Sequence, residues 1–236
     1  MESVMIDVAA RCKAVMEKIR VAADKSGRDP DSVKLMAATK TQGVAEVRAA
    51  VDAGVRFLGE NYVQEAQAKV RALDDVAEWH LIGHLQRNKA KTAVDLFSVL
   101  QSVDNLQLAR VLDREGSKRE QDVRVFIEIN LAAEASKTGV KREDLVPLVK
   151  EIAQLERLQV EGLMTIPPAS SDPEESRSYF RELRELRDTL EDLSIANVNP
   201  VELSMGMTHD FAVAIEEGST MIRVGTALFG QRPTRP

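Results

Sequence analysis

The sequence predicts an α/β fold, namely a single-domain (β/α)8 barrel over residues 1–236 with an extra helix before its first strand. From Val33 onward, short β-rich runs alternate with longer segments of helical periodicity, a pattern typical of a parallel sheet with crossover helices. Eight such β-rich runs occur, and 236 residues is a common length for a barrel of eight strands. No sequence repeat or low-complexity tract interrupts this alternation.

The expected elements follow one another in the order that such a barrel requires. A helix over 4–25 comes first, and Gly27 and the turn around Pro30 end it. Between 174 and 193, leucines recur at three- and four-residue steps among Arg and Glu, which predicts a helix with one face on the sheet and one in water. The predicted strands are 33–38, 56–59, 79–82, 96–100, 123–130, 159–164, 201–204 and 221–224.

Composition and charge narrow the class of protein. Charged residues make up 30% of the chain but the formal net charge is -6, so the basic excess of a nucleic-acid-binding protein is missing. Cys12 is the single cysteine, which excludes an intramolecular disulfide and favours a reducing compartment. Residues 1–7 lack the basic and apolar segments of a secretory signal, and no apolar stretch is long enough to span a bilayer. We therefore expect a cytoplasmic protein without nucleic-acid or membrane partners.

Lys40 follows the apolar run 35–39 at the end of the first predicted strand. Strand ends are where barrels carry their functional residues, and the small neighbours of Lys40 favour a partly desolvated, neutral amine that attacks an aldehyde. Small residues also follow the last two predicted strands, in 203–206 and 223–230, where backbone N–H groups can approach a phosphate. An amine and a phosphate cradle together indicate pyridoxal 5′-phosphate. The alternative is an ordinary solvated lysine beside a strand.

Six motifs extend this hypothesis to a family. They are MAATKT (36–41), GENYVQE (59–65), HLIGHLQRNK (80–89), GLMTIP (162–167), LSMGM (203–207) and RVGTALFG (223–230). In this order they resemble the pyridoxal phosphate homeostasis protein family, also called the YggS or proline synthase co-transcribed family. The resemblance extends from Val33 to Gly230. It implies a TIM barrel akin to the N-terminal domain of bacterial alanine racemase, with the cofactor held as a Schiff base on Lys40.

The resemblance also implies the residues around the cofactor. Arg223 is expected at the pyridine nitrogen, where a permanent cation favours an unprotonated ring and weakens the cofactor as an electron sink. The full set of expected cofactor contacts is Lys40, Asn61 and His84 near the ring, Arg223 at its nitrogen, and Ser204, Gly225 and Thr226 at the phosphate. Structural roles remain open for each: turn geometry for Gly225, capping for Asn61, Ser204 and Thr226, an ion pair for Arg223 and a loop hydrogen bond for His84.

Function is expected to be storage, buffering or delivery of the cofactor, with an influence on amino-acid and keto-acid balance, and we assign no catalytic residue. Related racemases use a tyrosine from a partner subunit and a further β domain. This chain ends at Pro236, and its two tyrosines, Tyr62 and Tyr179, fall in predicted helices. His80 and His84 straddle a strand and its turn without a third ligand, so we assign no metal.

Two enzymatic alternatives remain open at this stage. One is a weak pyridoxal-dependent amino-acid racemase, and the other is an aldolase whose lysine forms an imine with its substrate and needs no cofactor. For the binding protein, we expect a monomer whose partners are pyridoxal-dependent apo-enzymes. Lys137, in the loop after the fifth predicted strand, is a hypothetical second amine that receives the cofactor in transit.

Overall fold

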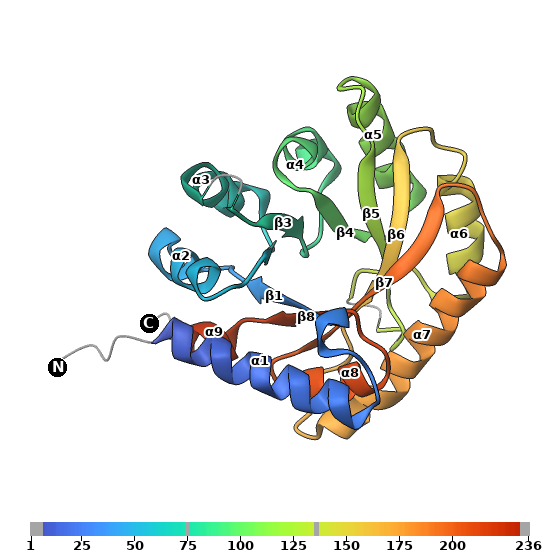
Figure 1. Cartoon of the computed structure of the whole chain (residues 1–236). Helices are drawn as coiled ribbons and strands as arrows, with labels where there is room; N and C mark the ends of the chain where they lie inside the picture. Colours follow the sequence, from blue (N-terminus) through green and yellow to red (C-terminus); the bar gives the residue numbers. More distant parts are fainter. Residues whose placement is uncertain (1–6, 74–75, 135–136, 232–236) are drawn as a thin grey trace.

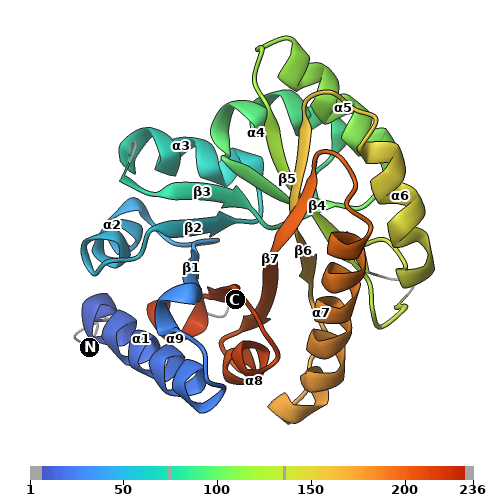
Figure 2. The same ribbon diagram turned by 45° about the vertical axis from the view of Figure 1, so that its right-hand side comes forward.

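The computed structural model describes residues 7–73, 76–134 and 137–231. Within them, eight parallel strands pair in chain order and the last pairs with the first to close a barrel (Figure 1, Figure 2). The predicted fold class is therefore confirmed. The strands are β1 Lys34–Ala38, β2 Phe57–Glu60, β3 Glu78–Leu81, β4 Val99–Val103, β5 Val123–Ile129, β6 Leu158–Thr165, β7 Val198–Met207 and β8 Met221–Val224.

Helices surround the barrel and connect its strands (Figure 2). They are α1 Val8–Lys25, α2 Val44–Asp52, α3 Val63–Leu73, α4 Ala90–Leu96, α5 Leu106–Ser117, α6 Leu145–Ile152, α7 Arg177–Asp192, α8 Phe211–Glu216 and α9 Thr226–Phe229. Short 3-10 turns at Pro30–Ser32, Arg87–Lys89, Arg142–Asp144 and Pro173–Ser176 come before β1, α4, α6 and α7. Among the described residues, no helix is long and apolar enough to cross a membrane.

The expected extra helix is α1, whose N-terminus is capped by the Asp7 side chain accepting from the Ala10 N–H at 2.9 Å. Residues 4–6 of the predicted helix lie outside the described residues. In Figure 1, α1 packs along the outside of α8 and α9, and it also contacts α2. This helix therefore covers the seam where β8 meets β1.

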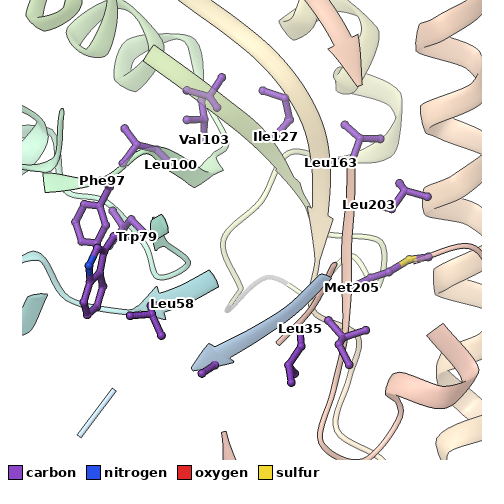
Figure 3. Packing of buried hydrophobic residues seen from close by; sticks show 14 of the residues in the cluster. Leu35, Leu58, Trp79, Phe97, Leu100, Val103, Ile127, Leu163, Leu203 and Met205 are labelled. Atoms are coloured by element: carbon purple, nitrogen blue, oxygen red, sulfur yellow. The ribbon is translucent and has the colours of Figure 1, made fainter. Parts of the chain in front are cut away.

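Side-chain alternation along the strands separates two apolar layers. Residues of one parity pack between the sheet and the helices, as Figure 3 shows for Leu35, Leu58, Leu100 and Ile127. Residues of the other parity fill the barrel interior, where the apolar cluster consists of Met36, Ile82, Val99, Phe126, Met164 and Met221. Further along β4, β5, β7 and β8 the inward positions are buried polar residues, namely Gln101, Glu128, Ser204 and Arg223. The interior is thus apolar in part and polar toward the carboxyl ends of the strands.

The fourth and seventh strands depart most from their predicted bounds, and Tyr62 lies outside its predicted helix. The fourth strand was expected at 96–100, but Leu96 ends α4 and the Phe97 N–H bonds to the Ala93 carbonyl at 3.0 Å, so β4 is Val99–Val103. The seventh strand is longer than 201–204 at both ends. Tyr62 was expected in a helix, but it precedes α3 and is 60% exposed, whereas Tyr179 does lie in α7.

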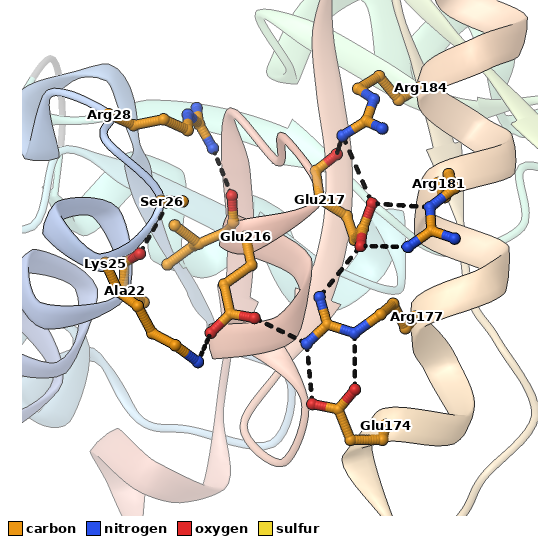
Figure 4. A network of polar contacts seen from close by, with 11 residues as sticks. Ala22, Lys25, Ser26, Arg28, Glu174, Arg177, Arg181, Arg184, Glu216 and Glu217 are labelled. Atoms are coloured by element: carbon orange, nitrogen blue, oxygen red, sulfur yellow. Dashed lines mark hydrogen bonds and ion pairs between the residues drawn. The ribbon is translucent and has the colours of Figure 1, made fainter.

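A charged network fixes α8 from the outside (Figure 4). The Glu217 carboxylate is 5% exposed and accepts hydrogen bonds from Arg177 and Arg181, both on α7. Glu216 pairs with Lys25 of α1 at 2.6 Å and with Arg177 at 2.7 Å. Because α8 connects β7 to β8, these contacts hold the two strands that carry Ser204 and Arg223.

Candidate cofactor site

Lys40 lies at the carboxyl end of the barrel, two residues beyond β1. It has the same parity as Met36 and Ala38, which belong to or pack on the interior cluster, and its side chain is half-buried. Thr41 follows with a φ of 65°, so the chain turns sharply after the lysine. The sequence-predicted amine is therefore placed at the mouth of the barrel.

A buried ion pair lies directly beside this lysine. Lys69 of α3 donates from Nζ to Glu60 Oε1 at 2.6 Å and to the Thr39 carbonyl at 2.7 Å. The Thr39 hydroxyl donates to the same Glu60 oxygen at 2.5 Å. Glu60 is fully buried and Lys69 is 7% exposed. The pair fixes the residue that precedes Lys40.

Arg223 extends inward from β8 and is 5% exposed. Its Nη1 donates to the Ser204 carbonyl and to the Ser204 hydroxyl, both at 2.7 Å, and its Nη2 donates to the Thr165 carbonyl at 2.8 Å. Burial lowers the pKa of this guanidinium to about 10, and the carboxylates of Glu128 and Asp210 oppose that shift. Arg223 is therefore a fixed cation at neutral pH.

Behind Arg223, polar side chains continue across the barrel interior. Ser204 is fully buried, and its hydroxyl donates to Gln101 Oε1 at 2.6 Å. Gln101 Nε2 lies 2.8 Å from His80 Nδ1, and His80 Nε2 lies 3.3 Å from Glu78 Oε1. Burial lowers the pKa of His80, although the nearby Glu78 carboxylate opposes that shift. His80 is therefore a neutral core residue that belongs to a polar chain.

Asn61 and His84, the residues expected near the cofactor ring, follow β2 and β3. Within the described residues, Asn61 Oδ1 is buried and has no hydrogen-bond partner, so the asparagine does not cap α3 through this atom. Gly83 passes so close that a Cβ added there would lie 2.3 Å from the Asn61 carbonyl oxygen. His84 is exposed and lines a hollow of about 840 Å³ together with Arg87 and Asn105.

The expected phosphate residues do not form one group. Gly225 follows β8 and Thr226 begins α9, and a Cβ at Gly225 would lie 3.4 Å from the Ala38 carbonyl oxygen, so both stand beside the end of β1. The Ser204 hydroxyl instead points into the barrel interior, where Arg223 and Gln101 bond it. The hydroxyl that reaches α9 is Thr208, which accepts from the Ala227 N–H at 3.4 Å.

Glu128, at the inward face of β5, was missed by the sequence reasoning. It lines a cavity of about 280 Å³ with Asn130, Lys137 and Thr138, and the Thr138 hydroxyl donates to Glu128 Oε1 at 2.9 Å. Burial, assisted by the Asp104 carboxylate, raises the pKa of Glu128. Lys137 pairs with Glu134 at 2.6 Å and reaches the Pro167 carbonyl at 3.3 Å. Strand alternation was the available signal for Glu128, because it lies two residues after Phe126 in a predicted strand.

Asn61 Oδ1 provides a test of whether these residues fit pyridoxal 5′-phosphate. A buried acceptor without a partner costs free energy unless a ligand supplies the donor. This acceptor lies at the same end of the barrel as the Lys40 amine and the fixed Arg223 cation. A primary amine, a neutral polar group and a cation are groups that suit the aldehyde, a ring substituent and the ring nitrogen of the cofactor, so the residues fit it.

Comparisons with known proteins identify the family of this chain. The family model of the alanine racemase N-terminal domain matches residues 11–233, which defines the chain as a barrel of that class. A relative named pyridoxal phosphate homeostasis protein in Aquifex aeolicus is 42% identical over 228 residues, which cover 96% of this chain and 99% of that protein. A relative of the same name in Escherichia coli K12 is 37% identical over 232 residues, which cover 97% of this chain and 98% of that protein. The chain belongs to the pyridoxal phosphate homeostasis protein family.

Solved structures show the same relationship. PipY of Synechococcus elongatus PCC7942, solved with pyridoxal phosphate bound, superimposes with a TM-score of 0.80 at 36% identity, covering 94% of this chain and all (100%) of that one. An unknown protein from Bifidobacterium adolescentis gives a TM-score of 0.91 at 36% identity, with 94% of each chain covered. Alanine racemase of Clostridium difficile shares the fold alone, at 14% identity and a TM-score of 0.71, and this chain covers 60% of its length.

Proposed function

We propose that this chain binds pyridoxal 5′-phosphate and serves its homeostasis by storing, buffering or delivering it, without catalytic turnover. The observation that carries the proposal is the placement of Lys40 after β1, of the unpartnered Asn61 Oδ1 after β2 and of the buried Arg223 cation in β8, three neighbouring strands of the barrel. When bound, the cofactor would supply an aldehyde, and Lys40 would hold it there as a Schiff base. Names of relatives at 37% to 42% identity support this role.

The chain's own residues would divide the work of binding. Lys69 and Glu60 hold Thr39 and thereby set the position from which Lys40 reaches the aldehyde carbon. Arg223 keeps a positive charge where the ring nitrogen would lie, which disfavours a proton on that nitrogen and so disfavours carbanion chemistry. Gly225 and Thr226 would offer backbone N–H groups to the phosphate. This distribution favours a carrier over a catalyst that uses the protonated ring as an electron sink.

We further propose a cytoplasmic monomer that delivers the cofactor to pyridoxal-dependent apo-enzymes. Lys137 is part of this proposal as a second amine on the route. Its contacts with Glu134 and the Pro167 carbonyl place it in the cavity next to Glu128, on the same end of the barrel as Lys40. Unchanged transfer to an apo-enzyme from a Lys137→Ala variant would remove Lys137 from the route and leave cofactor binding standing.

The test of cofactor binding is borohydride reduction of the protein after incubation with pyridoxal 5′-phosphate, followed by peptide mapping. We expect one pyridoxyl group, fixed on Lys40, and its loss together with the visible absorption band in Lys40→Ala. Lys91→Ala, which removes an exposed lysine of α4, should leave both unchanged. A protein that stays colourless and unmodified would overturn the proposal and favour an aldolase that uses Lys40 on its substrate.

Catalytic turnover is tested separately in the loaded protein. Incubation with alanine in deuterated water should leave the α position unlabelled over many hours. Deuterium at that position in the unmodified protein, absent in Lys40→Ala, would make the chain a weak racemase and contradict the non-catalytic assignment.

A further inference from the structure

We propose that Gln101 and His80 are positioning residues for Arg223: they fix the guanidinium in the barrel interior and thereby set the charge that a cofactor at the mouth experiences. The effect on the cofactor rests on the proposed function. The effect on Arg223 concerns the cofactor-free chain alone, so the two can fail independently.

The argument starts from strand alternation. His80, Gln101, Ser204 and Arg223 occupy inward positions of β3, β4, β7 and β8, and each is at most 5% exposed. They form consecutive contacts of 2.8 Å between His80 and Gln101, 2.6 Å between Gln101 and Ser204, and 2.7 Å between Ser204 and Arg223. A continuous polar chain therefore joins four strands across the barrel.

The hydrogen-bond donors and acceptors of these four side chains are compatible with one direction of donation, from Arg223 through Ser204 and with Gln101 donating to His80. Arg223 can only donate, so the Ser204 oxygen accepts from it and the Ser204 hydroxyl proton goes to Gln101 Oε1. Gln101 Oε1 then faces Ser204, and its amide nitrogen donates to His80 Nδ1 and contacts the Met221 sulfur at 3.1 Å. His80 Nδ1 must therefore be unprotonated, with the imidazole proton on Nε2, the atom 3.3 Å from the Glu78 carboxylate. The cation at one end specifies the tautomer at the other.

The surroundings of His80 are compatible with this neutral tautomer. The Phe57 and Phe126 rings meet the imidazole edge-on, at centroid distances of 6.0 and 6.4 Å. The charged groups that act on it are Glu78 on its own strand, Arg124 of β5 and Lys34 of β1, and the two cations disfavour an imidazolium. Burial acts in the same direction.

Disturbing Gln101 or His80 must therefore displace Arg223. A proton on His80 Nδ1 would face the Gln101 amide nitrogen, so the amide would have to turn over. Its nitrogen would then face the Ser204 oxygen, which already accepts from Arg223. The Ser204 hydroxyl proton would lose its acceptor, and the guanidinium would lose one of its three contacts. No other arrangement of these groups keeps every contact.

The first experiment uses the cofactor-free wild-type protein and nitrogen NMR. We expect the Nε2–H tautomer of His80 at neutral pH, and resolved guanidinium signals of Arg223 that show slow rotation of its terminal nitrogens. Observation of the Nδ1–H tautomer, or of a freely rotating Arg223 guanidinium, overturns the proposal without any variant.

The second experiment compares Gln101→Leu with Gln121→Leu, which removes a surface glutamine that donates only to the Val94 carbonyl at 3.4 Å. Gln101→Leu should lose the resolved Arg223 signals and bind pyridoxal 5′-phosphate about tenfold more weakly, since the Ser204 hydroxyl that accepts from Arg223 loses its buried acceptor. Gln121→Leu should match the wild type in both. Identical Arg223 signals in the two variants would refute positioning, even if cofactor binding changed.

Gln101→Glu keeps the experiment decisive if the leucine variant does not fold. A carboxylate at this position still accepts from Ser204, but it offers His80 an acceptor instead of a donor. We expect His80 to take a second proton, visible as an imidazolium at neutral pH, with a shifted absorption maximum of the bound cofactor. A His80 whose Nδ1 stays unprotonated in this variant contradicts the proposal. Unaltered cofactor absorption beside a protonated His80 would retain the positioning role and reject its effect on the cofactor.

Discussion

The ion pair between Lys69 and Glu60 should be among the most sensitive points of the structure. Lys69→Met keeps the aliphatic stem but removes the ammonium that lies 2.6 Å from Glu60 Oε1. The Glu60 side chain is 0% exposed and its Oε2 has no hydrogen-bond partner among the described residues, so the substitution leaves a buried charge with the Thr39 hydroxyl as its remaining contact. Breaking one partner of such a pair costs about 3 to 5 kcal/mol.

For a chain of this length, each kcal/mol corresponds to roughly 2 to 4 °C in Tm, so we expect a decrease of about 6 to 20 °C. The assays are thermal unfolding followed by circular dichroism and urea titration, both on cofactor-free protein because a bound ligand would stabilise the native state. Urea midpoints should fall while the m-value stays constant, since the substitution does not change the surface exposed on unfolding.

The matched control is Lys118→Met. Lys118 also pairs with a glutamate at 2.6 Å, but its side chain is 66% exposed, and its partner Glu115 keeps Arg119 at 2.9 Å. An exposed pair of this kind contributes less than about 1 kcal/mol. Adding Glu60→Gln to Lys69→Met should recover most of the loss, because no unpaired charge is then buried. Equal destabilisation by Lys69→Met and Lys118→Met would refute the reasoning.

Two further outcomes follow from the backbone and from the buried histidine. Gly206 has a φ of 92°, and a Cβ there would lie 2.5 Å from the Ala214 Cβ; at Gly27 the φ is 68°, but no atom lies within 4 Å of an added Cβ. Gly206→Ala should therefore destabilise the protein by about 2 kcal/mol more than Gly27→Ala. Urea titration compares the two variants, and equal losses of stability would contradict the steric argument. The pKa of His80 is lowered from 6.5, so the unfolded chain binds more protons near pH 6 and the free energy of unfolding should decrease as the pH falls below about 6.5. Glu128, whose pKa is raised, changes the stability with the opposite sign above pH 4.5. The difference in free energy of unfolding between wild type and His80→Gln removes the contribution of Glu128 and isolates that of His80. A difference that does not change with pH would contradict the prediction.

The barrel could be predicted from the sequence because its outer layer is regular. Apolar residues at strand spacing, such as Leu35 and Ala37, pack against helices whose leucines recur at helical spacing, and both patterns are visible without coordinates. The same rule failed at β4. Its inward Gln101 and its Ser102, whose hydroxyl donates to the Gly83 carbonyl at 2.7 Å, interrupt the apolar run, so the predicted strand stopped short. The polar residues of β4 are therefore the reason that its second half was not predicted as strand.

The candidate site was predictable in part for the same reason. Lys40 and Arg223 could be placed because Lys40 follows an apolar strand and Arg223 lies within one, and their parity fixes the side they face. Lys69 and Glu60 could not be paired, since the glutamate ends β2 while the lysine occupies a helical position that is typical of a solvated face. Likewise Ser204 satisfies a phosphate motif in the sequence, but the contacts of its hydroxyl with Arg223 and Gln101 depend on three strands at once.

These buried polar groups bear on why the barrel interior is not simply apolar. Replacing a buried charged pair and its hydrogen-bonded neighbours with well-packed apolar residues is often neutral or stabilising. Stability alone therefore does not favour Glu60 and Lys69 between β2 and α3, or Gln101 and Arg223 in the barrel interior. Glu60 and Lys69 instead hold Thr39 beside Lys40, and Gln101 bonds the Ser204 hydroxyl that accepts from Arg223. In the function proposed above, these residues serve to hold the Lys40 amine and the Arg223 guanidinium at fixed positions. Variants that gain stability at these positions should therefore lose cofactor binding.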